Sequence, residues 1–238
     1  MARTVLITGG TSGIGRTTAE LFAADGDRVL ITGRHRDTVE RAAAELSVEG
    51  VPCDATDPRQ VAELADRVPE LHVLVNAAGG LPTPAPADLP PLDAVLADWQ
   101  ANLAQNLLGA VLTTTALRPA LVPGGTVISI GSLGAERRGG AYGASKAALA
   151  AWNSALSAEL GPLDVTANVI SPGYIEDTGF FQGAMTPERR AALIAETHTN
   201  RPGTPADVAR TVHFLASPGA RHLTGQTLHL NGGAHTTR

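Results

Sequence analysis

Short apolar runs rich in β-branched residues alternate along this chain with longer segments of helical periodicity. The first run, Thr4–Thr8 (TVLIT), ends at a glycine, and residues 14–24 then repeat apolar positions at helical spacing before Asp25-Gly26. Short apolar runs bounded by glycine predict buried strands, whereas an apolar repeat every three to four residues predicts a helix. By these criteria we expect seven strands, at residues 4–8, 28–32, 48–53, 71–76, 125–130, 165–170 and 227–230.

The segments between these strands predict helices, with turn signals at several ends. Pro58 stands in the first turn of one helix, Gly161-Pro162 stops another, and the five prolines of residues 82–91 predict an irregular loop. The expected helices lie at about 14–24, 38–46, 58–68, 93–117, 142–160, 187–197 and 205–215. Because the alternation is unbroken, we expect one α/β domain: a doubly wound, seven-stranded parallel sheet with helices on both faces, joined by right-handed crossovers.

The composition is that of a globular protein. Of the 238 residues 43% are hydrophobic, and the formal net charge is −5 with no basic block, which argues against a nucleic-acid partner. The N-terminal apolar run is too short for a signal peptide and no apolar stretch approaches the length of a membrane span, so we expect a cytoplasmic protein. The single cysteine, Cys53, is interpreted as a buried core residue. The seven histidines lack metal-site spacing, and we expect no metal.

The first predicted strand runs into a glycine-rich segment, Thr8–Gly15 (TGGTSGIG). Gly9 can adopt a positive φ in the tight turn, and a residue without a Cβ lets the backbone approach a pyrophosphate. The N-terminus of the following helix presents free N–H groups and partial positive charge to that phosphate. A plain glycine-rich turn is the alternative, but the position between a strand and a helix at the start of a βαβ unit favours dinucleotide binding.

The end of the second strand indicates which dinucleotide is bound. An NAD enzyme usually carries an acidic side chain there for the ribose 2′-hydroxyl, whereas this chain has Gly33 and Arg34. Arg34 could pair with a 2′-phosphate through a charge-assisted hydrogen bond, and Arg36 could assist. A solvated loop arginine is the alternative. We therefore expect NADP(H) rather than NAD(H).

One predicted helix carries a tyrosine and a lysine one turn apart, Tyr142 and Lys146. Leucines on the same stripe indicate that this face turns toward the sheet, where an unpaired ammonium is costly. A phenol with a pKa near ~10 is a poor proton donor at neutral pH, and a nearby ammonium favours its ionised form. A solvated ion-pair neighbour fits this position poorly, so we interpret the pair as catalytic. The full stripe is Tyr142, Lys146, Leu149, Asn153, Leu156 and Leu160.

The opposite face of the same helix is small and uncharged. A solvated face normally carries lysine and glutamate, so small residues indicate close packing against another helix. We expect this face to form the interface of a homodimer or homotetramer. Its residues are Ala144, Ala147, Ala151, Ser154, Ala155 and Ala158.

Together these motifs resemble the short-chain dehydrogenase/reductase family, of the classical type, over nearly the whole chain. The family's glycine motif corresponds to Thr8–Gly15, its NNAG sequence to Asn76–Gly79 (NAAG), and its YxxxK motif to residues 142–146. Residues 203–233 are very similar to the end of bacterial 3-oxoacyl-acyl-carrier-protein reductases. The resemblance implies a single Rossmann-type domain over 1–238, with a cofactor half at about 1–120 and a catalytic and substrate half at about 121–238.

The resemblance also implies a mechanism, in which a hydride passes between NADP(H) and a carbonyl compound or secondary alcohol. Tyr142 would transfer the proton at the oxygen, Ser132 would hydrogen-bond that oxygen, and Lys146 would lower the pKa of the tyrosine and hold the nicotinamide ribose. Asn106 would anchor a water of the proton relay. Taken alone, Ser132 could be a strand-end serine and Asn106 a polar contact within a helix.

The resemblance further implies the residues that bind the two reactants. The cofactor-binding residues are Gly9, Thr11, Ser12, Gly13, Ile14, Gly15, Arg34, Asp54, Ala55, Asn76, Ala77, Ala78, Gly79, Tyr142, Lys146, Pro172, Gly173, Ile175 and Thr178. The substrate-binding residues are Ser132, Leu133, Tyr142, Tyr174 and Phe180. Phe181 and Met185 could extend this apolar lining, or they could simply pack within the segment after Gly173, which closes over the substrate in this family.

This chain departs from the family pattern near the substrate. Only ten residues separate Ser132 from Tyr142, and Asp177 stands where the family has a threonine, with Thr178 next. A one-residue bulge could return Thr178 to the cofactor. Arg137 and Arg138 could attract a carrier or coenzyme A phosphate, or remain solvated.

The substrate is left open between several classes. A 3-oxoacyl or polyketide-like ketone is the leading expectation, and a small secondary alcohol, a polyol or a steroid is the alternative. A non-catalytic NADP(H)-binding sensor on the same fold is a further alternative, which the presence of both Tyr142 and Lys146 disfavours.

Overall fold

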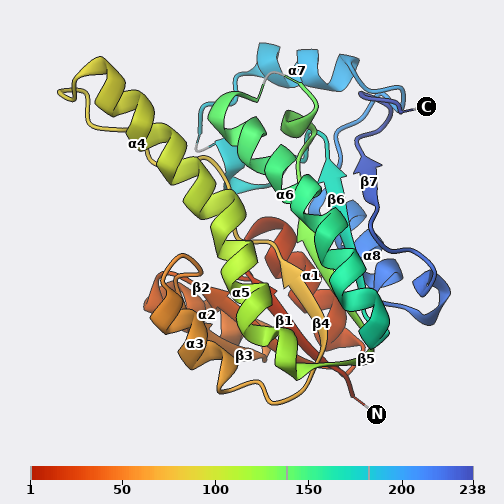
Figure 1. Ribbon diagram of the computed structural model, residues 1–238. Helices are drawn as coiled ribbons and strands as arrows, with labels where there is room; N and C mark the ends of the chain where they lie inside the picture. The colour runs from red at the N-terminus through yellow and green to blue at the C-terminus, as the bar shows by residue number, and fades with distance from the viewer. Residues whose placement is uncertain (1, 138, 182, 238) are drawn as a thin grey trace.

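A seven-stranded sheet forms the centre of the molecule (Figure 1). The computed structural model describes residues 2–137, 139–181 and 183–237. All strand pairs are parallel, and the strand order is β3-β2-β1-β4-β5-β6-β7. The strands are β1 (Thr4–Thr8), β2 (Arg28–Gly33), β3 (Glu49–Pro52), β4 (Leu71–Asn76), β5 (Leu121–Ile130), β6 (Thr166–Pro172) and β7 (Thr227–Leu230). The doubly wound α/β fold predicted from the sequence is therefore confirmed.

Helices cover both faces of the sheet, and Figure 1 shows α5 and α6 in front of it with α1 and α8 behind. The helices are α1 (Gly13–Ala24), α2 (Arg36–Leu46), α3 (Pro58–Ala65), α4 (Pro91–Leu103), α5 (Gly109–Leu117), α6 (Gly140–Leu160), α7 (Pro187–Ala195) and α8 (Pro205–Leu215). None of these described helices is both long and apolar enough to cross a membrane.

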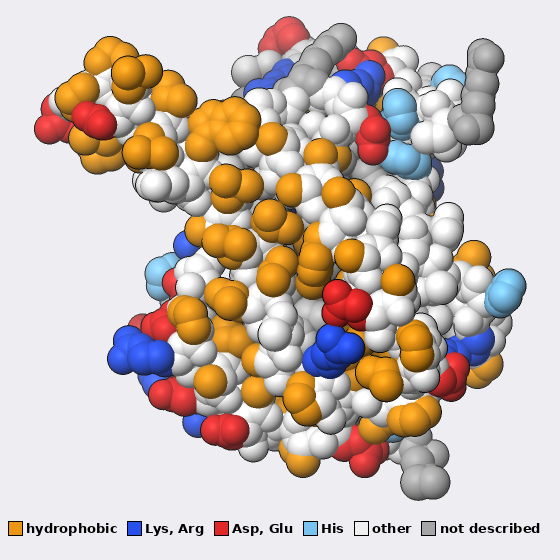
Figure 2. All heavy atoms as spheres, viewed as in Figure 1, with side chains coloured by type: hydrophobic (Ala, Val, Ile, Leu, Met, Phe, Trp, Pro, Cys, Tyr) orange, Lys and Arg blue, Asp and Glu red, His pale blue; other side chains and the backbone are white. Residues whose placement is uncertain are grey.

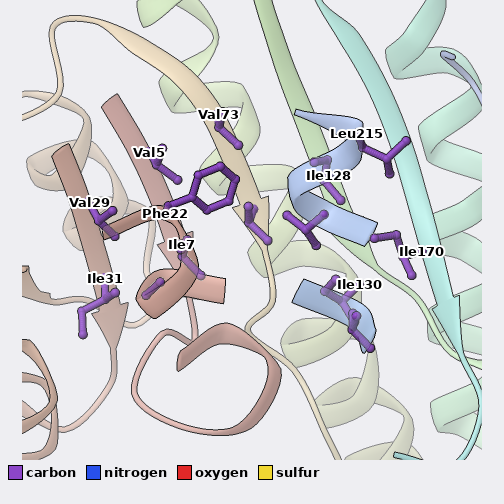
Figure 3. Close-up of a cluster of buried hydrophobic side chains, with 14 of the residues drawn as sticks. Val5, Ile7, Phe22, Val29, Ile31, Val73, Ile128, Ile130, Ile170 and Leu215 are labelled. Atoms are coloured by element: carbon purple, nitrogen blue, oxygen red, sulfur yellow. The ribbon is translucent and has the colours of Figure 1, made fainter. Parts of the chain in front are cut away.

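Two apolar layers hold the helices on the sheet, because successive strand residues point to opposite faces. On one face, Val5 and Ile7 of β1 pack with Phe22 of α1 and with residues of α2 and α8 (Figure 3). On the other face, Leu6 packs with residues of α3, α5 and α6, including Leu156. Both faces of every central strand are buried, which explains the continuous apolar runs in the sequence.

The strand order reverses between β1 and β4, which neighbour each other in the sheet although β2 and β3 intervene in the chain. At such a switch point the loops after the two strands diverge to opposite faces and leave a crevice at the carboxyl ends. The two loops approach closely, since a Cβ on Gly9 would lie 2.8 Å from Cα of Ala78. The fold thus places the glycine-rich segment and the NAAG segment beside each other.

The prediction of one continuous helix at 93–117 is wrong, because a π-helical turn interrupts it. The chain forms α4, then a π-helical turn, η1 (Ala104–Leu108), and then α5. A π turn takes in an additional residue, and apolar periodicity cannot reveal it because the pattern on either side remains helical. Several other boundaries shift by two to four residues. For example, β5 begins at Leu121 rather than 125, and β6 continues to Pro172 because that residue pairs with Leu230 of β7.

Candidate active site

The residues singled out by the sequence gather at the carboxyl ends of β1, β4, β5 and β6. The glycine segment follows β1, the NAAG segment follows β4, Ser132 follows β5, and Pro172-Gly173 ends β6. Helix α6 begins close to this edge and packs against β6 and η1. The edge is therefore where groups from four strands and one helix meet.

The glycine segment forms a tight turn whose helix end is open. Gly9 has φ of +68°, and a Cβ on Gly15 would lie 2.3 Å from the carbonyl oxygen of Gly9, so neither position accepts a side chain. Ser12 is the N-cap of α1 but makes no side-chain cap, and the first turn has no acidic residue. The N–H groups of α1 are thus available for an anion, and the turn fits the phosphates of a dinucleotide.

A residue in the left-handed conformation brings Thr178 to this turn. Asp177 has φ of +57°, and the methyl group of Thr178 lies 3.5 Å from where a Cβ of Gly13 would be, while its hydroxyl donates to the carbonyl of Ile175 at 3.3 Å. Thr178, rather than Asp177, therefore lies beside the glycine segment, as one of the two alternatives left by the sequence has it. Aspartate tolerates this conformation better than most residues.

The remaining predicted cofactor residues lie on both sides of the turn. Gly33, at the end of β2, packs against Thr11, with 3.0 Å between the position of its Cβ and the threonine methyl. Arg34 is exposed, and among the described residues its guanidinium has no ion-pair or hydrogen-bond partner. The carboxylate of Asp54 accepts hydrogen bonds from the backbone and hydroxyl of Thr56 at 2.9 and 2.8 Å.

The buried Asn76 points into the helix layer rather than toward the crevice. Its amide donates to the hydroxyls of Thr114 on α5 and Ser129 on β5, at 3.0 and 3.3 Å. Its contribution to the site is therefore the placement of β4 and of the backbone that follows, Ala77–Gly79. Ala78 is held there because its N–H donates to the hydroxyl of Thr8 at 3.1 Å.

Tyr142 and Ser132 meet across the short loop between β5 and α6. The Ser132 side chain acts to lower the pKa of the nearby Tyr142 phenol, and its hydroxyl accepts from the backbone N–H of Gly134 at 3.0 Å. A Cβ on Gly134 would lie 3.2 Å from Cε1 of the tyrosine ring, so the backbone itself supports one side of that ring. The Ser132 hydroxyl lies 3.3 Å from the same Cβ position, so both side chains are held against Gly134 at the edge of the sheet.

Lys146 lies one turn further along α6 and points inward, as the helix stripe predicted. It is 5% exposed, and its Nζ donates to the carbonyl oxygen of Ile130 at the end of β5, at 2.8 Å. The same Nζ is 6.0 Å from the centre of the Tyr142 ring and 3.1 Å from where a Cβ of Gly79 would be. The ammonium therefore sits between the tyrosine and the segment after β4.

Asn106 is placed by the π turn η1, and its side chain binds the same segment. Its Oδ1 accepts from the N–H of Gly80 at 2.8 Å, and its Nδ2 donates to the carbonyls of Gly80 and Asn102 at 3.0 and 3.2 Å. Oδ1 also lies 2.8 Å from the position of a Gly79 Cβ. Asn106 and Lys146 thus both lie against the backbone of Gly79, and π turns frequently occur at functional sites.

Comparison with known proteins decides the family. The family model described as enoyl-(acyl carrier protein) reductase matches residues 9–235. A 3-oxoacyl-acyl-carrier-protein reductase of Escherichia coli (strain K12) is 31% identical over 241 residues, covering 97% of this chain and 96% of its own. The chain belongs to the short-chain dehydrogenase/reductase family. It is an oxidoreductase of that family.

Solved structures of short-chain dehydrogenases have the same fold. One from Burkholderia cenocepacia, in complex with NADP, is 32% identical with a TM-score of 0.85, covering 98% of this chain and 97% of its own. A 7α-hydroxysteroid dehydrogenase complexed with NADH and 7-oxo glycochenodeoxycholic acid is 28% identical with a TM-score of 0.86, covering 97% and 93%.

The electrostatics of this dehydrogenase differ from the expectation in one respect. Burial raises the pKa of Tyr142, opposed by the hydrogen bond with Ser132, and burial lowers the pKa of Lys146 to about 8. The expected net lowering of the tyrosine pKa is therefore absent in this structure, because burial of the phenol is a larger effect than the opposing interaction with Ser132. Lys146 remains mostly protonated at neutral pH, since a pKa of about 8 still lies above 7.

The lid segment, residues 174–181, lies over the tyrosine. The ring of Phe180 meets that of Tyr142 at 5.4 Å between centroids, and Tyr174 contacts Phe181 at 5.9 Å. Leu133 is half-buried in the loop after Ser132. Arg137 of that loop pairs with Glu196 at the end of α7; Arg138 lies outside the described residues.

Sequence reasoning missed the glycines that make the short loop possible. A Cβ on Gly143 would lie 2.2 Å, and one on Gly139 2.1 Å, from the carbonyl oxygen of Gly134. Helix α6 therefore packs directly on the backbone of this loop. This close packing allows the short loop to bring Ser132 and Tyr142, ten positions apart in the sequence, together. Gly134, Gly139 and Gly143 are visible in the sequence, but a glycine-rich loop by itself predicts only a turn and not this close packing.

Replacing Lys146 with methionine should stabilise the protein while removing its charge. The pKa of Lys146 is about 8 in the folded state, below the ordinary lysine value of 10.5. The folded state therefore binds this proton more weakly than the unfolded chain does, and this difference lowers the stability of the wild type at pH 7. We expect Lys146→Met to raise the free energy of unfolding at pH 7 by about 1–3 kcal/mol. Urea denaturation at several pH values measures this.

The pH dependence provides the internal control. Between about pH 8 and 10.5 the wild type gains stability as the pH rises, because the folded state has released the Lys146 proton while the unfolded chain still binds it, whereas the variant gains none at this position. The difference between the two proteins should therefore shrink as the pH rises. A variant that is less stable than the wild type at pH 7 would contradict the proposed cost of burying the ammonium.

Proposed function

We propose that this enzyme is an NADP(H)-dependent ketone reductase, acting on a 3-oxoacyl or polyketide-like ketone. The observation that carries the proposal is the arrangement at the end of β5: the side chains of Ser132 and Tyr142 lie together against Gly134, with the buried Lys146 beside them. A hydroxyl pair of this kind can bind and protonate one carbonyl oxygen. The 3-oxoacyl-acyl-carrier-protein reductase among the similar proteins supports this choice of substrate class.

The chain's own residues would hold the cofactor along the edge of the sheet. The open N-terminus of α1 would take the pyrophosphate, Asp54 and Ala55 the adenine end, and Ala77–Gly79 and Pro172-Gly173 the nicotinamide end. Ile175 and Thr178 would close over it from the lid segment. When bound, NADP(H) supplies the hydride that reduces the carbonyl carbon, or takes up the hydride from the alcohol.

The side chains would then perform the proton chemistry. Ser132 would donate a hydrogen bond to the substrate oxygen and orient it, while Tyr142 transfers the proton to that oxygen. Lys146 would stabilise negative charge on the phenol oxygen as the proton leaves, because a buried positive charge acts strongly over a short distance. Asn106 would keep the segment after β4 in place beside the lysine and anchor a water for proton return.

The preference for NADP(H) over NAD(H) is supported by the charge at the end of β2. Arg34 is exposed without a partner among the described residues, and Gly33 leaves no acidic group in the place that would repel a phosphate. The complex of the Burkholderia cenocepacia dehydrogenase with NADP agrees with this proposal. The cofactor half would then be residues 1–120, and the catalytic and substrate half residues 121–238.

A second candidate function is the dehydrogenation of a secondary alcohol, a polyol or a steroid. The 7α-hydroxysteroid dehydrogenase among the similar structures favours it, as does the apolar lid above Tyr142. A non-catalytic sensor is disfavoured, because the chain carries both Tyr142 and Lys146, and a protein that only binds the cofactor needs no proton donor beside it.

Replacing Tyr142 with phenylalanine tests the central proposal. The variant keeps the ring against Gly134 and Phe180 but lacks the proton-transferring hydroxyl. We expect at least a roughly 1,000-fold loss of kcat with NADPH binding almost unchanged. Ketone reduction followed by NADPH absorbance, with NADPH affinity measured in parallel, checks this. Near-normal turnover would refute the assignment.

Replacing Arg34 with alanine tests the cofactor preference. Loss of a charge-assisted hydrogen bond to a 2′-phosphate should weaken NADPH binding about 10-fold to 100-fold and leave NADH binding unaffected. Arg41→Ala, at an exposed arginine of α2, is the matched control. Titration of each protein with both cofactors measures the effect. Equal weakening for NADPH and NADH would contradict the assignment.

We also propose that the enzyme is a homodimer or homotetramer. Ala147, Ala151 and Ala155 of the small face of α6 are exposed, and the neighbouring α4 projects from the body of the molecule (Figure 1). Figure 2 shows apolar side chains gathered on that projection. The exposed apolar residues of α4 are Leu92, Val95, Leu96 and Trp99. Contiguous exposed apolar surface of this kind indicates a protein–protein interface.

A charge on the small face should separate the subunits. Ala151→Glu would place a carboxylate in a closely packed interface, so light scattering at micromolar concentration should give a lower mass than for the wild type. Ala44→Glu, the same substitution at an exposed alanine of α2, should leave the mass unchanged. A wild-type protein with a monomeric mass would overturn the proposal.

A further inference from the structure

Half of the chain's large aromatic side chains form one series of ring contacts at the site. The sequence has four phenylalanines, two tyrosines and two tryptophans, and four of these eight take part. Tyr142 contacts Phe180 at 5.4 Å, Phe180 contacts Phe181 at 5.0 Å, and Phe181 contacts Tyr174 at 5.9 Å between ring centroids. All three contacts are edge-to-face, with interplanar angles of 61°, 87° and 61°. In a chain with 3% aromatic residues this concentration indicates a specific use.

The series of ring contacts ends at Tyr142, the proposed proton donor, and therefore places an aromatic side chain next to the proposed substrate position. The Tyr142 ring is supported by the backbone of Gly134 on one side, and Phe180 meets it from the lid segment. Because the Phe180 ring lies against the Tyr142 ring, a ketone whose oxygen binds the Tyr142 and Ser132 hydroxyls would have one of its two substituents near Phe180. The wall at this point is the edge or face of an aromatic ring rather than an aliphatic chain.

The charges around the lid segment argue against an anionic substrate. Each of the three described arginines nearby already has a partner: Arg137 pairs with Glu196, Arg190 pairs with Glu176 at 2.6 Å, and Arg189 lies over the Phe181 ring at 5.1 Å. An anionic group would have to compete with a carboxylate for Arg137 or Arg190, and with the Phe181 ring for Arg189. An uncharged substrate meets no such competition.

From these observations we propose that the enzyme acts on uncharged ketones that carry an aromatic ring next to the carbonyl, and that Phe180 determines this specificity. The inference rests on the proposed ketone reduction and assigns a class of ketone to the same site. Phe180 acts by offering an edge-to-face contact to the substrate ring in place of the one that it makes with Tyr142. Aromatic pairs of this geometry gain stabilisation beyond the burial of their area, so a saturated ring of the same size does not replace the aromatic one.

A pair of ketones that differ only in ring saturation tests the inference. Acetophenone and cyclohexyl methyl ketone have the same carbon skeleton, and their kcat/KM values are measured with NADPH for each protein. The intrinsic reactivity of the two ketones cancels when the acetophenone-to-cyclohexyl ratio of a variant is divided by that of the wild type. Phe180→Leu keeps an apolar side chain without a ring, and should lower this ratio about 3-fold to 10-fold.

Two further variants separate recognition from folding. Phe180→Trp retains an aromatic ring and should keep the ratio at or near the wild-type value. Phe214→Leu makes the same ring-to-leucine change at a half-exposed residue of α8 and should change neither kcat/KM value. Thermal unfolding and NADPH binding of Phe180→Leu should match the wild type, because the residue lies in the lid segment outside both apolar layers.

The outcomes distinguish this inference from the proposed function. An unchanged ratio in Phe180→Leu, or an equal fall in Phe214→Leu, overturns the role of Phe180. If the wild type reduces 3-oxoacyl thioesters but neither ketone of the pair, the aromatic substrate class is wrong and ketone reduction stands. If it reduces no ketone with NADPH or NADH, the proposed function itself falls.

Discussion

The site depends on one hydrogen bond, from the buried ammonium of Lys146 to the carbonyl oxygen of Ile130. Burying a cation with so few partners is unfavourable, and its lowered pKa reflects that cost. The apolar layers on both faces of the sheet stabilise the fold sufficiently to hold the lysine there. Because α6 is fixed by Leu149, Leu156 and Leu160 against the sheet, the lysine cannot move to solvent, and Tyr142 is fixed with it.

The site also requires that the backbone of its loops approach neighbouring atoms closely, and glycine allows this at three contacts. Gly9 packs on the backbone at Ala78, which joins the loops after β1 and β4. Gly79 packs on the side chains of Asn106 and Lys146, and Gly143 packs on the carbonyl of Gly134. A methyl group at any of these positions would meet atoms at 3.1 Å or less, so the loops after β1, β4 and β5 could not converge on one small region.

The lid segment connects the two halves of the site. Asp177, in the left-handed conformation, turns Thr178 toward the glycine segment, while Phe180 three residues later reaches Tyr142. One short segment thus lies against the glycine segment and Tyr142 together. Movement of this segment would expose both at once, which is compatible with the proposed binding of two reactants at this edge of the sheet.

The sequence by itself determined the elements and the helix face that carries the chemistry. Alternating apolar runs and helical repeats gave the seven parallel strands, and the leucine stripe of α6 correctly predicted that Lys146 points inward, because burial follows from local periodicity. Tertiary structure decided the rest. Only the packed fold revealed the π turn at Asn106 and the hydrogen bonds of Asn76 to the helix layer. It also revealed the carbonyl partner of Lys146 and the position of Thr178 beside the glycine segment. These features depend on contacts between loops that are distant in the sequence, and the spacing of residues along one element carries no record of such contacts.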